Sequence, residues 1–169
     1  FYDISEGKYK KLSIESNSLS FEILKEKDKL IRKNWSASIL DLGDEVAGIE
    51  YHSALKKELN PIDGSILETI DFALDWVSEN NYKGLVISGD GPNFCAGANL
   101  NMILTMAERK DWESINNVTQ LMQNIMQKVR FSQFPVVAAP YGLVLGGGFE
   151  TIGACDRIVA AAESYIGLV

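Results

Sequence analysis

The sequence predicts an α/β fold in which helices alternate with short buried strands. Apolar residues recur at spacings of three and four over 66–77 and again over 112–129, which is typical of amphipathic helices. A short apolar run follows each of these segments, at 85–87 and 135–139, as expected of strands that are buried on both faces. A third strand is expected at 157–161, after a short helical segment. Helices that alternate with buried strands favour a layered sheet with much parallel pairing.

Composition narrows the functional classes. The chain has 169 residues, of which 46% are apolar and 23% charged, so we expect about one globular domain. The net charge of −7 gives no electrostatic reason to bind nucleic acid or an anionic membrane, although a local cluster can still bind an anionic ligand. No apolar run reaches the roughly 18 residues of a membrane helix, and the first residues lack the apolar core of a signal peptide. We expect a cytoplasmic protein.

The first third of the chain carries little pattern before a predicted hairpin. Alternating runs at 38–42 and 45–51 flank a Gly43-Asp44 turn, which is the signature of a β-hairpin. Before the hairpin, only residues 20–24 show an alternation of apolar and polar residues, which predicts either an edge strand or part of a linker. The chain starts at Phe1 without an initiator methionine and stops inside an apolar stretch, so we expect a piece of a longer protein.

Both long helices have recognisable features. The helix over 66–77 follows Asn60-Pro61, has Asp63 or Ser65 available as its N-cap, and is ended by Asn80-Asn81. In the helix over 112–129, the spacing of the apolar residues predicts that its tryptophan and methionine side chains pack in the core.

Two loops, 88–100 and 140–150, follow the first two buried strands, where ligands bind in open α/β sheets. Three consecutive glycines at 146–148 open a helix and expose backbone N–H groups, which suits an anion or an oxyanion. A tight turn is the alternative. A dinucleotide fingerprint is excluded because Thr151 stands where glycine is needed, and no lysine follows as in a phosphate loop.

Glu150 turns the glycine cluster into a candidate site. It lies three residues after Gly147, so the carboxylate and the Gly147 N–H flank one face of the helix. An N–H donor and a carboxylate in this arrangement can bind a carbonyl that becomes an enolate: the donor holds the oxyanion and the carboxylate moves a proton or orients water. The alternative is that Glu150 only stabilises the N-terminus of the helix, where acidic residues are favoured. Cys95 is expected to be a small buried residue rather than a nucleophile, and the single histidine, His52, is too isolated for a metal site.

Taken together, the two loops resemble the crotonase (enoyl-CoA hydratase/isomerase) superfamily. The segments that carry the resemblance are 94–100 (FCAGANL), 135–139 (PVVAA), 142–150 (GLVLGGGFE) and 155–157 (CDR), with Ser53-Ala54-Leu55 as a degenerate Asn-Ala-Leu segment. The match covers roughly 37–169 and is strongest to the hydratase part of bacterial proteins that fuse a 3-hydroxyacyl-CoA dehydrogenase to a hydratase. The resemblance implies a ClpP/crotonase spiral of ββα units, truncated at its C-terminus, with 1–35 as a lead-in from a preceding domain and 36–169 as the incomplete core.

The resemblance also assigns roles to residues. The N–H groups of Ala98 and Gly147 would form an oxyanion hole, and Glu150 would be one of two acid/base glutamates, the second falling just past Val169. Asn99 stands where the family commonly has aspartate. The acyl-CoA-binding residues that the resemblance implies are Ala54, Ala96, Ala98, Asn99, Leu100, Gly146 and Gly147.

The activity implied for the full-length parent is hydration of 2-enoyl-CoA in fatty-acid β-oxidation, with the present chain alone close to inactive. Two alternatives stay open, an enoyl-CoA isomerase that uses Glu150 alone and a non-catalytic module that docks CoA esters. The partner would be an acyl-CoA thioester, and a homo-oligomer of the parent is compatible with the family. No metal or cofactor is expected in this domain apart from the CoA of the substrate, and NAD is expected in the dehydrogenase domain.

Overall fold

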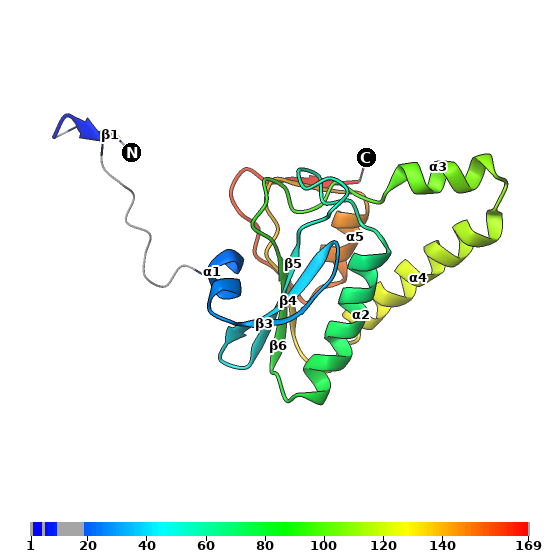
Figure 1. Cartoon of the computed structure of the whole chain (residues 1–169), viewed down its shortest axis with the longest axis horizontal. Coiled ribbons are helices and arrows are strands. Elements are labelled where there is room, and N and C mark those ends of the chain that lie inside the picture. Colours follow the sequence, from blue (N-terminus) through cyan, green and yellow to red (C-terminus); the bar gives the residue numbers. More distant parts are fainter. Residues whose placement is uncertain (1, 5, 10–18, 169) are drawn as a thin grey trace.

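A computed structural model describes residues 2–4, 6–9 and 19–168, and a six-stranded sheet runs through the larger part (Figure 1). Its strands lie in the order β3-β4-β5-β6-β7-β9. They are β3 (Leu30–Lys33), β4 (Ala37–Gly43), β5 (Val46–Tyr51), β6 (Gly84–Ser88), β7 (Val136–Ala138) and β9 (Arg157–Ile158). Two smaller sheets pair β1 (Tyr2–Asp3) with β2 (Lys8–Tyr9) and β8 (Leu143–Leu145) with β10 (Tyr165–Gly167). The helices are α1 (Phe21–Glu26), α2 (Gly64–Glu79), α3 (Leu100–Glu108), α4 (Trp112–Arg130) and α5 (Gly147–Ala154).

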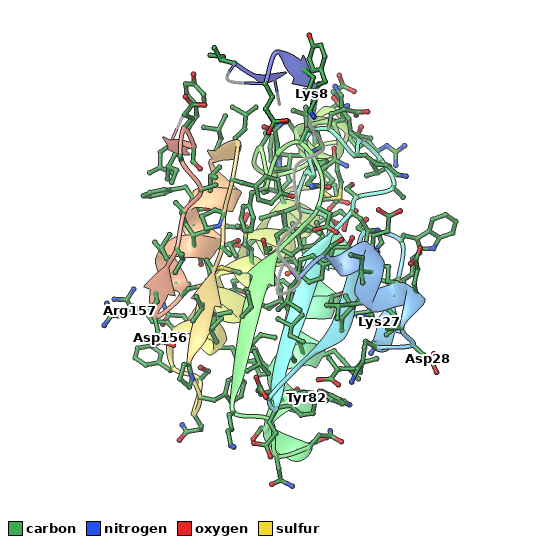
Figure 2. The ribbon with its side chains drawn as sticks, turned by 90° about the vertical axis from the view of Figure 1, so that its left-hand side faces the viewer. Lys8, Lys27, Asp28, Tyr82, Asp156 and Arg157 are labelled. Atoms are coloured by element: carbon green, nitrogen blue, oxygen red, sulfur yellow. The ribbon has the colours of Figure 1, made fainter. Side chains whose placement is uncertain are left out.

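The sheet is antiparallel at one side and parallel at the other. β3, β4 and β5 pair antiparallel, which confirms the predicted hairpin, and β5, β6, β7 and β9 pair parallel. Figure 2 shows α1, marked by Lys27 and Asp28, at one side of this sheet, and Asp156 and Arg157 at the other. The order β4-β5-α2 and β7-β8-α5 gives two ββα units, so the predicted α/β class is confirmed.

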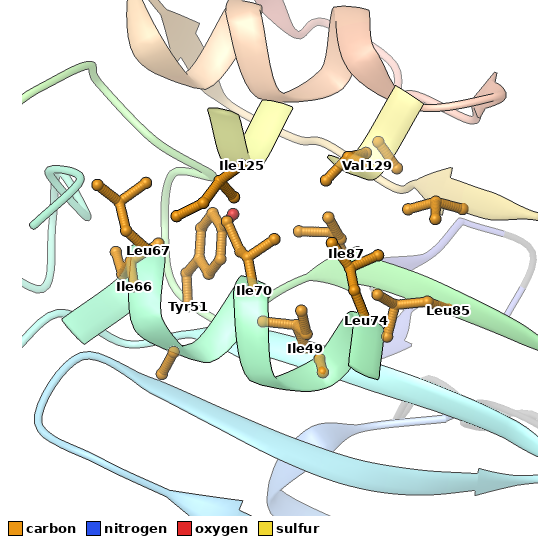
Figure 3. Packing of buried hydrophobic residues seen from close by; sticks show 14 of the residues in the cluster. Ile49, Tyr51, Ile66, Leu67, Ile70, Leu74, Leu85, Ile87, Ile125 and Val129 are labelled. Carbon is orange, nitrogen blue, oxygen red and sulfur yellow. The ribbon is translucent and has the colours of Figure 1, made fainter. Parts of the chain in front are cut away.

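Helix α2 covers the parallel region and supplies much of the core. Asp63 caps it by accepting a hydrogen bond from the Ile66 N–H at 2.9 Å, as predicted, and Asn80 follows its last turn. Its apolar stripe packs against β5 and β6 (Figure 3). The stripe consists of Ile66, Leu67, Ile70, Ala73, Leu74 and Val77. All six are buried, as the periodicity of the sequence indicates.

The strand alternative for 20–24 is wrong, because this segment begins helix α1. Phe21 and Leu24, one turn apart, pack together against Leu40 of β4. The Ser20 hydroxyl and the Glu22 N–H both bond the Asp90 carboxylate at 3.1 Å, which fixes the start of the helix against the loop after β6. A helix with two apolar residues on one face is too short to show a clear period in the sequence.

The predicted core position of Trp112 is also wrong. Helix α4 forms over the expected residues, but Trp112 is 63% exposed and only Ile125 and Val129, in the second half of the helix, are fully buried. Met122 is partly buried against the core, in agreement with the prediction. The first half of α4 contacts α3 and extends away from the sheet (Figure 1). The apolar stripe therefore continues beyond the part of the helix that the core covers.

Three smaller differences concern strands and boundaries. The strand expected at 157–161 is shorter in the structure and ends at Ile158. Beyond it the chain still makes individual backbone hydrogen bonds, such as one of 2.8 Å from the Val159 N–H to Ala138 O. Strand β8 lies inside the segment predicted as a loop. Of the described residues before the expected boundary at residue 35, those at 19–34 pack on the core, because β3 pairs with β4 and α1 packs against Leu40. Strands β1 and β2 pair with each other away from the sheet (Figure 1), and residues 10–18 lie outside the described part. No helix in the described ranges is long and apolar enough to cross a membrane.

Candidate functional site

The two glycine-containing loops meet through Cys95. The Cys95 N–H donates to Leu143 O at 3.0 Å, and the Leu145 N–H donates to Cys95 O at 2.9 Å, so the loop after β6 runs parallel to β8. Because Ala98 lies three residues after Cys95, and α5 begins two residues after Leu145, this pairing brings the two predicted N–H donors to one place.

The Ala98 N–H belongs to a peptide unit that is held from its other side. Gly97 has a φ of +99°, a conformation that favours glycine. Its carbonyl oxygen accepts a hydrogen bond of 2.8 Å from the Ile62 N–H. Since N–H and C=O point in opposite directions across a planar peptide, that bond aims the Ala98 N–H away from Ile62. Within the described residues the Ala98 N–H has no acceptor.

The Gly147 N–H is arranged in the same way. Gly146 precedes helix α5 with φ +50° and ψ −119°, a conformation open to glycine. Its carbonyl accepts a 3.0 Å hydrogen bond from the Glu150 N–H, and the Gly147 N–H at the helix start finds no acceptor in the described part of the chain. A Cβ placed on Gly147 would lie 3.7 Å from Ala98 N, so the two unpaired donors are neighbours.

A cavity of about 400 Å³ opens beside these donors, between α3, α4 and α5. Ala98 and Glu150 both line it. The other lining residues are Ile103, Val118, Thr119, Met122, Gln123, Met126, Gln127, Arg130, Gly153 and Ala154. An apolar wall with a few polar groups is typical of a small-molecule site. The arrangement can hold a carbonyl oxygen at the two N–H groups and place a carboxylate near the adjoining carbons.

The remaining predicted binding residues lie on two sides of this cavity. The Asn99 side chain caps α3 by accepting from the Met102 N–H at 3.4 Å, and Leu100 is exposed at the start of that helix. Ala96 donates its N–H to Leu59 O at 2.7 Å, which joins its loop to the segment that follows Ala54. Their contacts with a ligand stay predictions.

A second, open cavity of about 610 Å³ lies at Ala54 and contains residues that the sequence reasoning missed. It is lined by Lys33, Asn34, Trp35, His52, Ala54 and Lys57. Within the described ranges neither lysine forms an ion pair, and Trp35 is 79% exposed. Two free cations beside an exposed aromatic ring suit an anionic ligand with a flat ring. Lys57 follows Ala54 closely in the chain, whereas Lys33 reaches the cavity only through the pairing of β3 with β4.

His52 and Cys95 do not form a base and thiol pair, because each has other hydrogen-bond partners. The Nε2 of His52 lies 2.8 Å from the Ser38 Oγ, and burial is the main cause that lowers its pKa. Burial raises the pKa of the Cys95 thiol to about 11, so the thiol stays protonated at neutral pH. Its hydrogen-bond partners in the described part of the chain are backbone atoms of Gly97, and none of them is a base.

Comparison with known proteins matches residues 45–169 to the family described as enoyl-CoA hydratase/isomerase. A probable 3-hydroxyacyl-CoA dehydrogenase of Bacillus subtilis is 42% identical over all 169 residues, which span 20% of that protein. The fatty acid oxidation complex subunit alpha of Aliivibrio fischeri is 31% identical over 135 residues, or 78% of the chain and 19% of that protein. The chain therefore spans about a fifth of the length of these relatives.

Solved structures give the same result. An enoyl-CoA hydratase from Bacillus anthracis is 29% identical with a TM-score of 0.69, over 79% of this chain and 50% of that one. An enoyl-CoA hydratase from Thermoplasma volcanium is 27% identical with a TM-score of 0.70, over 80% of this chain and 52% of that one. The crotonase-like fold expected from the sequence is confirmed.

Proposed function

The chain belongs to the enoyl-CoA hydratase/isomerase family, and from this premise we propose that it supplies the oxyanion hole and one acid/base glutamate of a 2-enoyl-CoA hydratase. The active enzyme is a longer protein, in which a hydratase part and a 3-hydroxyacyl-CoA dehydrogenase part act in fatty-acid β-oxidation. The names of these relatives, and the fifth of their length that the chain spans, support this assignment.

One observation carries the proposal: two N–H groups that have no acceptor among the described residues lie together with one carboxylate at a single cavity. The thioester carbonyl oxygen accepts hydrogen bonds from Ala98 and Gly147, which stabilise the negative charge that develops on it when water attacks C3. Glu150 orients the water or moves a proton at the neighbouring carbon. Water oxygen bonds to C3 and a proton reaches C2, so the 2-enoyl thioester becomes a 3-hydroxyacyl thioester. A second acid/base group lies outside this chain.

The polar end of CoA fits the second cavity. Lys33 and Lys57 face the phosphates there, and Trp35 offers a ring to the adenine. The hydrogen bond from Ala96 N–H to Leu59 O links the segments that border the two cavities, which supports a pantetheine path along this backbone. The lysines add a local positive charge to a chain whose net charge is −7.

NAD belongs in the dehydrogenase part under this proposal. The glycine turn of this chain lacks a dinucleotide fingerprint, because Thr151 stands where glycine is needed.

The test is Glu150→Gln in the full-length protein, with hydration of crotonyl-CoA followed by loss of the conjugated thioester absorbance. We expect kcat to fall by roughly 10²–10⁴-fold, because the amide does not move the proton. Glu113→Gln is the matched control, since Glu113 is also an exposed first-turn glutamate, on α4. Unchanged hydration in Glu150→Gln would remove Glu150 from the acid/base machinery, and a wild type that binds CoA esters but hydrates none would leave only a module that docks them. Full activity of the 169-residue chain alone would contradict the second acid/base group.

A second candidate, enoyl-CoA isomerisation, is favoured by one feature of the cavity. Among the described residues Glu150 is the one carboxylate that lines it, and a single carboxylate suffices to shuttle a proton along an allylic system. The two reactions are separated by supplying 3-enoyl-CoA and 2-enoyl-CoA to the full-length protein. Faster turnover of 3-enoyl-CoA would replace hydration with isomerisation as the proposed function.

A further inference from the structure

We propose that Cys95 is a positioning residue of the oxyanion hole, which sets the separation and direction of the Ala98 and Gly147 N–H groups. The inference rests on the proposed function, because it assumes that these two donors bind a thioester carbonyl. Cys95 is fully buried and is not among the residues that line the cavity, so it acts through the two loops that it joins.

The backbone of Cys95 fixes the loop that leads to Gly147. Its N–H and C=O bond to Leu143 and Leu145, on either side of Val144, and helix α5 starts two residues later. The Gly146 N–H donates to Gly167 O at 3.1 Å, so β10 holds the other side of the same loop. Any displacement of Cys95 is therefore transmitted to the peptide unit that carries the Gly147 N–H.

The thiol of Cys95 fixes the loop that carries Ala98. Its Sγ accepts the Gly97 N–H at 3.4 Å and lies 3.7 Å from Gly97 O, to which a protonated thiol donates. That carbonyl belongs to the peptide unit whose N–H is the Ala98 donor. The raised pKa keeps the thiol protonated, which lets one sulfur act as acceptor and as donor.

Packing of Cys95 against helix α5 sets the distance between the two loops. A Cβ on Gly148 would lie 2.6 Å from Cys95 O, 2.9 Å from its Cβ and 3.1 Å from its Sγ. The second residue of α5 is thus in direct contact with Cys95, and glycine is required there for that contact. The side-chain volume at position 95 therefore controls how closely α5 approaches the Ala98 loop.

The test compares Cys95→Ala and Cys95→Ser in the full-length protein, with Cys155→Ala as the matched control. Cys155 is also a free thiol, although only partly buried, and bonds Thr151 O at 3.3 Å; within the described residues none of its hydrogen bonds reaches either donor loop. Two quantities are measured: kcat and KM for 2-enoyl-CoA hydration, and the carbonyl stretching frequency of a bound, unreactive acyl-CoA thioester. The frequency reads polarisation per bound molecule, so partial unfolding of a variant does not alter it.

We expect Cys95→Ala to lower kcat by about tenfold or more with KM changed less than about twofold, because misplaced donors weaken transition-state stabilisation. The thioester frequency should rise toward its value in water. Cys95→Ser should recover most of both effects, since a hydroxyl keeps the donor and acceptor, and Cys155→Ala should match the wild type.

The proposal is overturned if Cys95→Ala leaves the frequency unchanged, or if Cys155→Ala shifts it equally. It is also overturned if serine restores nothing. A wild-type protein that polarises the thioester but hydrates no enoyl-CoA would refute the proposed hydratase and leave the role of Cys95 supported. Failure of the wild type to bind any thioester would overturn both.

Discussion

The Glu150 N–H donates a 3.0 Å hydrogen bond to the carbonyl oxygen of Gly146. One residue thus contributes twice to the candidate site. Its side chain lines the cavity, and its backbone holds the peptide unit that presents the Gly147 N–H. The position of the carboxylate and the direction of the donor are coupled through a single turn of helix.

Gly146→Ala should damage this turn. At φ +50° and ψ −119° an alanine costs about 1–3 kcal/mol of backbone strain. We expect the free energy of unfolding of the 169-residue chain to fall by that amount in urea titrations. Activity of the full-length protein should fall too, because relief of the strain would rotate the peptide unit that carries the Gly147 N–H.

Gly64→Ala is the control for this prediction, because Gly64 begins helix α2 as Gly147 begins α5. Its φ is not in the left-handed region, and a Cβ there meets nothing within 4 Å. Alanine should therefore leave the free energy of unfolding unchanged or raise it by up to about 1 kcal/mol. Equal losses in the two variants would show that the Gly146 conformation carries no special strain.

Tyr51→Phe should stabilise the chain. The Tyr51 ring is fully buried, its hydroxyl has no hydrogen-bond partner among the described residues, and burial raises its pKa well above the usual range. Removing a buried hydroxyl that lacks a partner should raise the free energy of unfolding by about 1 kcal/mol. Tyr141→Phe should lower it by a similar amount, because the Tyr141 hydroxyl accepts the Gly91 N–H at 3.1 Å. Chemical denaturation of both variants checks the opposite signs.

The sequence indicates the parts of the site that depend on local chemistry. Gly146, Gly147 and Glu150 are recognisable because consecutive glycines before a helix expose donors, and a first-turn carboxylate shares their face. The helix over 66–77 and the hairpin are also predictable from local sequence, because the hydrophobic periodicity specifies the helix and the turn residues specify the hairpin.

Other features depend on which parts of the fold pack over a residue, and the hydrophobic periodicity of the sequence does not contain that information. Trp112 follows the same apolar spacing as Ile125, yet it is exposed because the core ends partway along α4. Lys33 enters the second cavity through strand pairing, and Cys95 joins the two loops through packing on Gly148. These relationships between distant segments need the assembled fold.

His52 should give stability a dependence on pH near neutrality. Burial lowers its pKa below the usual value of 6.5, while neighbouring Glu50 opposes this and Lys25 and Lys33 reinforce it. The unfolded chain therefore binds more protons around that pH, and the free energy of unfolding should fall as the pH drops through about 6.5. His52→Gln should flatten the curve over roughly pH 5.5–7.5. An identical slope in the variant would assign the effect to other groups.

Reversing the charge of Lys33 and Lys57 together should weaken the binding of CoA esters without changing the rate of the chemical step. Both lysines line the cavity at Ala54, away from the residues of the Glu150 cavity, so the double Glu variant should raise KM for 2-enoyl-CoA on the order of tenfold at low salt. Added salt should shrink the difference, and kcat should stay near the wild-type value. A pantetheine thioester, which lacks the nucleotide, should show no change in KM, and Lys110→Glu, at an exposed position outside both cavities, should behave as wild type. If the double variant raises KM for the pantetheine thioester as well, the lysines act on the thioester end or on folding, and the nucleotide end of CoA must bind elsewhere.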